Sequence, residues 1–193
     1  MPIWAPACFV CKKIVPADDA IPAGRTCRPC REKSRIYASF SPYSYDHPAI
    51  RALIHDLKYR RMRGAAPALG DILITALSFY GVSLPRDAFL VPIPLYPARA
   101  RVRGFNQAHL LADHIGKELG ISVCADLLKK IKNTRPQMQL SRDERLKNVS
   151  NAFAVSDSAA VANRTIILLD DVKTTGATLE SAARALRGAG AKR

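Results

Sequence analysis

The stretch Ile166–Leu179, IILLDDVKTTGATL, constrains the fold more than any other part of the sequence. Its four leading aliphatic residues predict a buried strand, and the two adjacent carboxylates that follow have to leave the apolar interior. A loop rich in hydroxyl groups comes next, and a helical pattern follows it. A strand, a glycine-containing loop and a helix in this order direct backbone N–H groups and the positive end of a helix dipole at one point. The stretch therefore predicts an anion site at the end of a strand.

The side chains of this loop fall into two chemical groups. Hydroxyl donors and small residues suit a phosphate group, and they are Thr174, Thr175, Gly176, Ala177 and Thr178. The ionised carboxylates of Asp170 and Asp171 only accept hydrogen bonds, so they bind hydroxyl groups and repel phosphate. Two acids behind a phosphate cradle match a ribose 5-phosphate, with the ribose diol on the acids. The sequence contains neither a Walker loop nor a GxGxxG dinucleotide turn.

The rest of the chain predicts an α/β fold around this stretch. Apolar patterns of strand length occur at residues 88–95, 121–123 and 127–131, and helical patterns at 106–119 and 177–187. Two further helices are expected at 48–63 and at about 67–80, whereas the basic segment 96–104 is expected to be a loop. Strands that alternate with helices predict a mainly parallel sheet with helices on both faces. Ligands of such folds bind outside the carboxyl ends of the strands, where the two aspartates arrive.

Four of the five cysteines form two pairs with two residues between the members of each pair: Cys8, Cys11, Cys27 and Cys30. Two such pairs across a short loop supply four thiolates for a tetrahedral structural zinc ion. The alternative is two disulfides, which are rare in a cytoplasmic chain. We therefore predict a zinc-binding ribbon over residues 1–40, followed by an α/β domain over 41–193. Cys124 is expected to be a plain buried thiol.

The charge of the chain favours a polyanionic partner. Thirty Lys and Arg residues against 16 Asp and Glu give a formal net charge of +14 and a pI of about 10.0. Such an excess attracts nucleic acid, acidic lipid headgroups or phosphorylated small molecules, although it also serves general solubility or reflects composition bias. The densest basic cluster follows an amphipathic helix, and it consists of Lys58, Arg60, Arg61 and Arg63.

Aromatic residues precede this basic cluster, at Tyr37, Phe40, Tyr43 and Tyr45. Backbone charge together with stacking aromatics is typical of proteins that bind single strands without sequence preference. The alternative is that these rings pack between the N-terminal module and the core. No apolar run approaches the length of a membrane span, and the N-terminus lacks the pattern of a signal peptide. We therefore expect a cytoplasmic protein without a membrane span.

Five segments together resemble one known family. They are the cysteine pairs at 8–30, YDHPAIRALIHDLKYR at 45–60, VPIPLYPARARVRGFNQAHLLA at 91–112, TRPQMQLSRDERLKNVSNAF at 134–153 and LLDDVKTTGATL at 168–179. The last resembles the signature of type I phosphoribosyltransferases, which bind phosphoribosyl pyrophosphate (PRPP) with Mg²⁺. More narrowly, the chain resembles the ComF family of competence-associated, phosphoribosyltransferase-like proteins. The resemblance covers nearly the whole chain.

The resemblance implies a role for each matching segment. Asp170 and Asp171 would take the ribose diol, and residues 174–178 the 5-phosphate. The loop with Leu95 and Tyr96 would face the pyrophosphate, assisted by Arg99, Arg101 or Arg103. A flexible loop would close over the site, and its residues are Arg135, Gln139, Arg142 and Arg145. Mg²⁺ would bridge pyrophosphate and ribose oxygens.

Two departures from the family pattern bear on this interpretation. Lys173 stands where many relatives have an aliphatic residue, and its side chain points either to solvent or toward phosphate. The family continues into another strand where this sequence stops at GAKR, so we expect a C-terminal strand to be missing.

Two functions from different classes fit these residues. The resemblance implies a PRPP-binding protein that acts in DNA uptake during natural transformation, binds single-stranded DNA and works with other DNA-uptake proteins. The alternative is a PRPP-dependent phosphoribosyltransferase that acts on an unidentified base or amine and has no role with DNA. A sensor of a phosphorylated metabolite is a third, weaker possibility.

Overall fold

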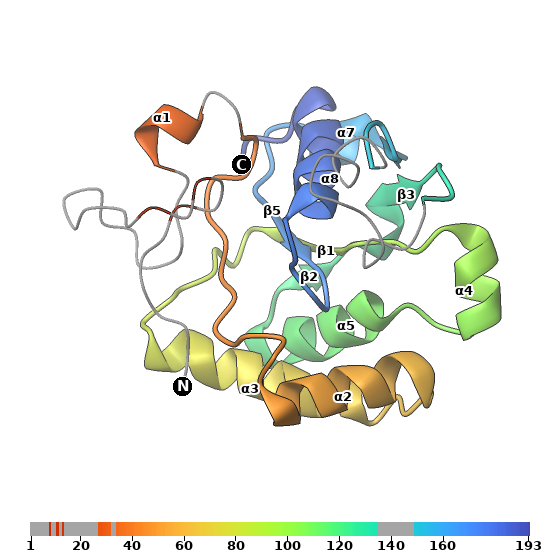
Figure 1. Cartoon of the computed structure of the whole chain (residues 1–193). Helices are drawn as coiled ribbons and strands as arrows, with labels where there is room; N and C mark the ends of the chain where they lie inside the picture. Colours follow the sequence, from red (N-terminus) through yellow and green to blue (C-terminus); the bar gives the residue numbers. More distant parts are fainter. Residues whose placement is uncertain (1–7, 9–10, 12, 14–26, 32–33, 135–148) are drawn as a thin grey trace. The chain divides into compact units, whose positions relative to one another are not determined.

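The computed structural model describes Cys8, Cys11, Lys13 and residues 27–31, 34–134 and 149–193 (Figure 1). The chain divides into two compact units, Met1–Leu84 and Pro85–Arg193. The predicted division into a zinc-binding ribbon over residues 1–40 and an α/β domain over 41–193 stays a prediction.

The N-terminal unit is helical in its described part. It contains the short α1 (Arg28–Arg31) and two longer helices that pack on each other, α2 (Pro48–Tyr59) and α3 (Ala65–Phe79). The buried side of α2 consists of Ile54 and Leu57. Pro48 occupies the first turn of α2, as the sequence predicts, because its fixed φ suits a helix start.

The end of α2 differs from the prediction. The helix ends at Tyr59 instead of Arg63, and Gly64 instead precedes α3. The reason is local, because Arg61 adopts a left-handed backbone conformation with φ of 58°. The N–H groups of Arg60 and Met62 both donate to the Asp56 carbonyl, at 3.2 and 3.1 Å, which turns the chain away from the helix axis.

The C-terminal unit contains a parallel sheet of three strands in the order β2–β1–β5. These strands are β2 (Ser122–Val123), β1 (Phe89–Pro92) and β5 (Ile166–Leu169). All four residues of β1 pair in register with all four residues of β5, from Phe89 with Ile166 to Pro92 with Leu169. The predicted mainly parallel sheet is therefore confirmed.

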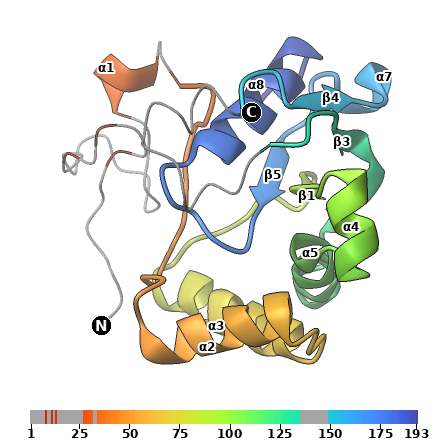
Figure 2. The same cartoon turned by 45° about the vertical axis from the view of Figure 1, so that its right-hand side comes forward.

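Two helices cover this sheet from opposite sides, α5 (Gln107–Leu119) and α8 (Ala177–Gly188), as Figures 1 and 2 show. Helix α5 packs on β1 and β2, whereas α8 contributes Leu186 to a buried cluster with Val91 of β1. The start of α5 is capped by Asn106, whose side chain accepts from the Ala108 N–H. Its end is closed by Gly120 at φ of 66°, as the sequence predicts.

Several elements differ from the sequence prediction. The basic segment expected to be a loop contains helix α4 (Pro97–Arg103), because proline at its start and left-handed Gly104 at its end supply both boundaries. Strand β3 (Leu128–Lys130) leaves the parallel sheet and pairs antiparallel with β4 (Phe153–Val155). Four described elements were not predicted from the sequence: α1, β4, the 3₁₀ helix η2 (Ala125–Leu127) and the short α7 (Ser158–Val161).

Residues near the end of the sequence lie along the start of β5. The Ile166 N–H donates to the Arg193 carbonyl at 2.8 Å, and the Lys192 N–H donates to the Arg164 carbonyl at 2.9 Å. Among the described helices, none is both long enough and apolar enough to cross a bilayer.

The contact between α5 and β2 predicts a sharp effect of adding one methyl group at Gly116. A Cβ atom there would lie 2.5 Å from the Val123 Cγ2 and 2.8 Å from the Ile121 carbonyl oxygen. We expect Gly116→Ala to lower the free energy of unfolding by about 1–3 kcal/mol, because the backbone has to move. Denaturant titration measures this change.

The matched control is Gly188→Ala in the last turn of α8, where a Cβ would meet no atom of another segment within 4 Å. This substitution should leave stability unchanged or raise it by about 0.5–1 kcal/mol. Equal stability of the two variants would contradict the described packing of α5 on β2.

Candidate functional site

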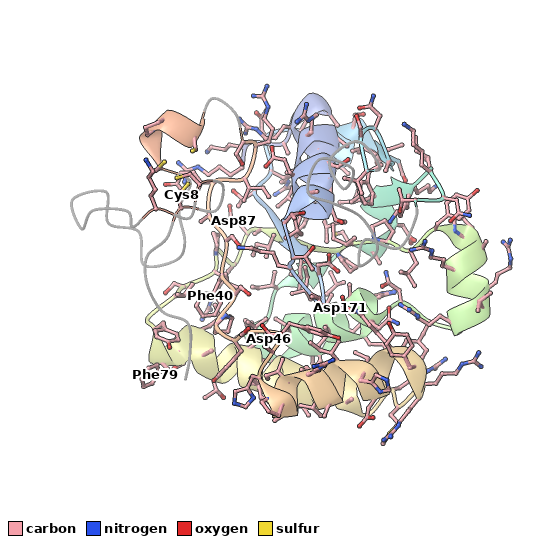
Figure 3. The ribbon with its side chains drawn as sticks, viewed as in Figure 1. Cys8, Phe40, Asp46, Phe79, Asp87 and Asp171 are labelled. Carbon is pink, nitrogen blue, oxygen red and sulfur yellow. The ribbon has the colours of Figure 1, made fainter. Side chains whose placement is uncertain are left out.

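The candidate site begins where β1 and β5 end together. Because the two strands are parallel and in register, their carboxyl ends reach the same edge of the sheet. The Ile93 N–H donates to the Leu169 carbonyl at 2.8 Å, which extends the pairing one residue beyond β1. The loop after β1 and the loop that starts at Asp170 therefore leave the sheet side by side. Figure 3 shows Asp171 at this end of β5.

A shallow hollow, open to solvent, lies in the loop between β5 and α8. Its lining includes four of the predicted PRPP-binding residues, Asp170, Thr174, Gly176 and Thr178, together with Val172, Lys173 and Leu179. The other three predicted residues, Asp171, Thr175 and Ala177, are not among the lining residues. Lys173 therefore lines the hollow, where it adds a positive charge.

The N-terminus of α8 opens onto this hollow. Gly176 precedes the helix at φ of 80°, a conformation that an L-residue with a side chain rarely adopts. Gly176 has no side chain that could cap the helix. The Thr175 hydroxyl accepts a hydrogen bond from the Ala177 N–H, but only at 3.4 Å. The positive end of the helix dipole thus adds to the charge of Lys173, and both favour an anion.

The two aspartates differ in their local geometry. The Asp170 carboxylate accepts from the Asp171 backbone N–H at 2.9 Å, which fixes its orientation directly after β5. Both side chains are half-buried. Asp170 thus presents a fixed acceptor at the hollow, and Asp171 extends the acidic edge beyond it.

Lys130 on β3 is a candidate site residue that the sequence analysis missed. Burial lowers the pKa of its ammonium group, and the positive charge of Arg99 lowers this pKa further. The negative charge of Asp170 opposes both effects. The ammonium nitrogen lies 5.6 Å from the ring centroid of Phe153. Two cations and one carboxylate from three separate elements therefore interact beside the hollow. No local motif could have revealed this grouping, because β3 reaches the site through its antiparallel pairing with β4.

The predicted pyrophosphate loop is held by backbone contacts. The Tyr96 carbonyl accepts from the Arg99 N–H at 2.8 Å, so the loop enters α4 immediately after Tyr96. The Arg99 guanidinium donates to the carbonyl of Thr134, a residue only 5% exposed. Arg103 lies in the last turn of α4.

Asn106 positions this loop from the other side and was not among the predicted site residues. Its amide nitrogen donates to the Ile93 carbonyl at 3.0 Å, while its amide oxygen caps α5. One side chain thus joins the end of β1 to the start of α5. The predicted flexible-loop residues lie outside the described part of the chain: Arg135, Gln139, Arg142 and Arg145.

The four paired cysteines form one cluster in the N-terminal unit. The sulfur atoms of Cys8, Cys11, Cys27 and Cys30 all lie within 4.8 Å of one another, and Figure 3 shows Cys8 among them. The sulfurs of Cys11 and Cys27 are 3.8 Å apart, and none of the four cysteines forms a disulfide. A tetrahedral ion with bonds of about 2.3 Å to sulfur needs sulfurs about 3.8 Å apart. The cluster can therefore hold a metal ion.

Backbone N–H groups support this cluster. Cys8 is fully buried, and its sulfur accepts from the N–H groups of Cys27 at 3.3 Å and Cys11 at 3.5 Å. Hydrogen bonding to Cys27, followed by burial, raises the pKa of the Cys30 thiol to about 12. A metal ion bound by these thiols would oppose this shift, because metal binding favours the thiolate and releases its proton. Cys124 is not a member of this cluster, and burial raises the pKa of its thiol as well.

The basic cluster spans the end of α2 and the turn after it. Arg60, Arg61 and Arg63 are exposed, and Lys58 is half-buried. Arg60 pairs with Asp56 at 3.2 Å. The aromatic residues before the helix do not act as one group, because the Phe40 ring contacts the Tyr80 ring of the same unit at 6.0 Å. Phe40 therefore contributes to packing within the N-terminal unit. Tyr37, in contrast, is 39% exposed.

Comparisons with known proteins agree with this architecture. Residues 105–193 match the family model of the phosphoribosyl transferase domain. The DNA utilization protein YhgH of Salmonella typhi is 30% identical over 176 residues, which cover 89% of this chain and 77% of the relative. Competence protein ComFC of Bacillus subtilis is 32% identical over 168 residues, 83% of this chain and 65% of the relative. The chain belongs to the ComF family.

A third member of the ComF family, competence protein F of Haemophilus influenzae, is 38% identical over 102 residues. That match covers 52% of this chain and 44% of the relative. No solved structure matches the chain significantly. The family and its phosphoribosyltransferase-like domain were thus both recognised from the sequence motifs.

Proposed function

We propose that this chain is a PRPP-binding protein that acts in DNA uptake and binds single-stranded DNA in the cytoplasm, together with other DNA-uptake proteins. PRPP binding is supported by the hollow at the end of β5, which is lined by a carboxylate and by the N-terminus of α8. The role with DNA is supported by the names of the relatives, which are competence and DNA utilization proteins, and by the net charge of +14.

The hollow and the acidic edge beside it suit the two ends of a ribose 5-phosphate. The start of α8, Thr174 and Thr178 offer donors and a positive dipole to the phosphate. Asp170 and Asp171 offer acceptors to the ribose hydroxyls. Arg99 and Lys130 supply the positive charge that a pyrophosphate group needs, and Mg²⁺ carried by PRPP would find carboxylate oxygens at the same edge.

A PRPP-dependent transferase without a role with DNA is the second candidate. The matched phosphoribosyl transferase domain favours it. In that reaction the acceptor would bond to the anomeric carbon of the ribose while the bond to pyrophosphate breaks. Release of pyrophosphate that depends on an added base or amine, in the absence of DNA, would distinguish it from the first candidate.

The PRPP site predicts a large effect of neutralising Asp170. We expect Asp170→Asn to weaken binding of PRPP with Mg²⁺ about ten- to hundredfold in calorimetric titration, because hydrogen bonds to a charged group contribute about 1.5–3 kcal/mol. Asparagine still accepts from the Asp171 N–H, so the loop should keep its fold. Asp126→Asn, at an exposed carboxylate on η2, is the matched control and should bind as the wild type does. Equal affinity of the two variants would refute this site.

The DNA-binding surface predicts a change in salt dependence. Replacing Lys58, Arg60, Arg61 and Arg63 by glutamine should weaken binding of a single-stranded oligonucleotide. The slope of log affinity against log salt should become shallower by up to about 0.7 for each lost phosphate contact. Fluorescence anisotropy at several salt concentrations measures both quantities.

A second variant controls for the loss of net charge. It neutralises four exposed cations of the C-terminal unit, Arg86, Lys117, Lys129 and Arg184. Each variant removes four positive charges, so an effect of total charge alone would weaken both equally. Equal affinities and slopes of the two variants would rule out the α2 surface as the binding site.

We further propose that the metal of the cysteine cluster is a structural zinc ion, because four thiolates fill a tetrahedral shell and leave no open position. The wild-type protein should contain about one zinc ion per chain. Cys8→Ser should lose it and destabilise the N-terminal unit, because metal binding supplies folding energy. Elemental analysis and hydrogen exchange measure the two effects.

Cys124→Ser is the control for the metal prediction, because this thiol lies outside the cluster. It should retain the metal and the exchange protection of residues 27–31. A Cys8→Ser protein that keeps both would show that the cluster does not depend on a metal ion.

A further inference from the structure

One ridge of the N-terminal unit carries an aromatic or basic residue at every fourth position. It consists of Tyr43, His47, Arg51, His55 and Tyr59. Residues four apart are neighbours on a helix surface, so Arg51, His55 and Tyr59 form a continuous row along α2, which begins after its N-cap His47. His47 and these three residues are exposed, whereas Tyr43 is half-buried. We call this row the α2 ridge.

The rings of the α2 ridge form two pairs with a cation between them. The Tyr43 and His47 ring centroids are 6.4 Å apart, and those of His55 and Tyr59 are 4.9 Å apart at an interplanar angle of 42°. Arg51 lies between the pairs in sequence and on the helix. The Tyr59 ring adjoins the basic cluster, and its side chain is 59% exposed.

The fold of the N-terminal unit does not account for these exposed rings. The buried side of α2 consists of Ile54 and Leu57, and neither belongs to the ridge. Met62, beside the ridge in the turn after α2, is another large apolar side chain that is 53% exposed. Exposed aromatic and apolar groups beside four cations indicate a binding surface for a ligand with both flat apolar faces and negative charge.

Single-stranded nucleic acid has this combination of groups. Its bases present π-faces that a duplex hides within the stack, and its phosphates present regularly spaced negative charges. From His47 to Tyr59 the helix rises about 18 Å, at about 1.5 Å per residue. At about 3.4 Å per nucleotide, this length matches about five stacked nucleotides. One ring pair, the ring of His47 and one cation lie along that length, which fits bases and backbone of a short segment.

We propose that the α2 ridge stacks unpaired bases of single-stranded DNA, with His55 and Tyr59 as its principal platform. The basic cluster contacts the adjacent phosphates. This inference rests on the proposed DNA-binding function and adds the basis for preferring single strands over duplex. The Arg60–Asp56 ion pair opens to phosphate at little cost, because the Arg60 side chain is 68% exposed.

The test uses the full-length chain, an oligonucleotide of about 15 thymidines, its duplex, and a phosphodiester strand of the same length without bases. We expect Tyr59→Ala to weaken binding of the thymidine strand about five- to hundredfold, because stacking contributes about 1–3 kcal/mol per base. The salt slope should not change, since no phosphate contact is lost. Binding of the strand without bases and of the duplex should also stay unchanged.

Two further variants keep the test specific to the ring. Tyr59→Phe retains the π-face and should bind as the wild type does. Phe79→Ala removes a ring on α3 that is 77% exposed and also contacts a neighbouring ring, Tyr80 at 5.0 Å, so it matches Tyr59 in exposure and environment. It should leave the affinity unchanged. Circular dichroism verifies that each variant is folded.

The outcomes separate the ridge from the underlying function. If the basic-cluster variant weakens binding and Tyr59→Ala does not, the DNA function stands and the stacking proposal is wrong. If neither variant weakens binding, the DNA function of this surface fails as well. A loss that Tyr59→Ala causes equally for the strand with and without bases would also overturn stacking, because it would show a contact to the backbone.

Discussion

The parallel pairing of β1 with β5 is the constraint on which the C-terminal unit depends. Because the strands pair in register over their full lengths, two loops distant in sequence leave the sheet at the same edge. The last bond of this pairing, from the Ile93 N–H to the Leu169 carbonyl, immediately precedes Asp170. Asn106 then binds the Ile93 carbonyl and caps α5, so the helix that covers one face is tied to the same edge. A few hydrogen bonds, from the backbone and from the Asn106 side chain, thus hold the sheet, the helix and the loops of this edge together.

The electrostatics of this edge follow from which elements reach it. Asp170 lies directly after a strand, where its orientation is fixed by a bond to the next N–H. Lys130 and Arg99 come from β3 and α4, and both lie near enough to interact electrostatically. Burial and Arg99 disfavour the charge on Lys130, whereas Asp170 favours it. An anion bound here would relieve the repulsion between the two cations, whereas a neutral ligand would leave it in place. The site therefore favours a ligand that carries both a negatively charged group and, next to it, groups that donate hydrogen bonds to a carboxylate.

The sequence revealed those features that local chemistry decides. The run from Ile166 to Asp171 contains its own strand and strand end, and Asn106 and Gly120 mark both ends of α5. The cysteine spacing likewise marks the cluster of four thiols that can hold a metal ion. It did not reveal features that depend on the backbone conformation of one residue or on distant pairing. Arg61 ends α2 early through a left-handed φ that arginine rarely adopts, and β3 pairs with a strand that the sequence analysis missed. For the same reason Lys130 was overlooked, since only the β3–β4 pairing accounts for its position.

The aromatic residues of the N-terminal unit illustrate why order along the chain is a poor guide to a surface. In the sequence, Phe40 and Tyr43 look like members of one group. In the structure, Phe40 contacts Tyr80 of α3 and belongs to the packing, whereas Tyr43 continues into a row along α2. The helical repeat, and not proximity in sequence, decides which rings share a surface with cations. A row with a period of four residues winds only slowly around a helix. Over the short length of α2 it therefore does not reach the buried side at Ile54 and Leu57. One helix can thereby serve the core on one side and a ligand along the other.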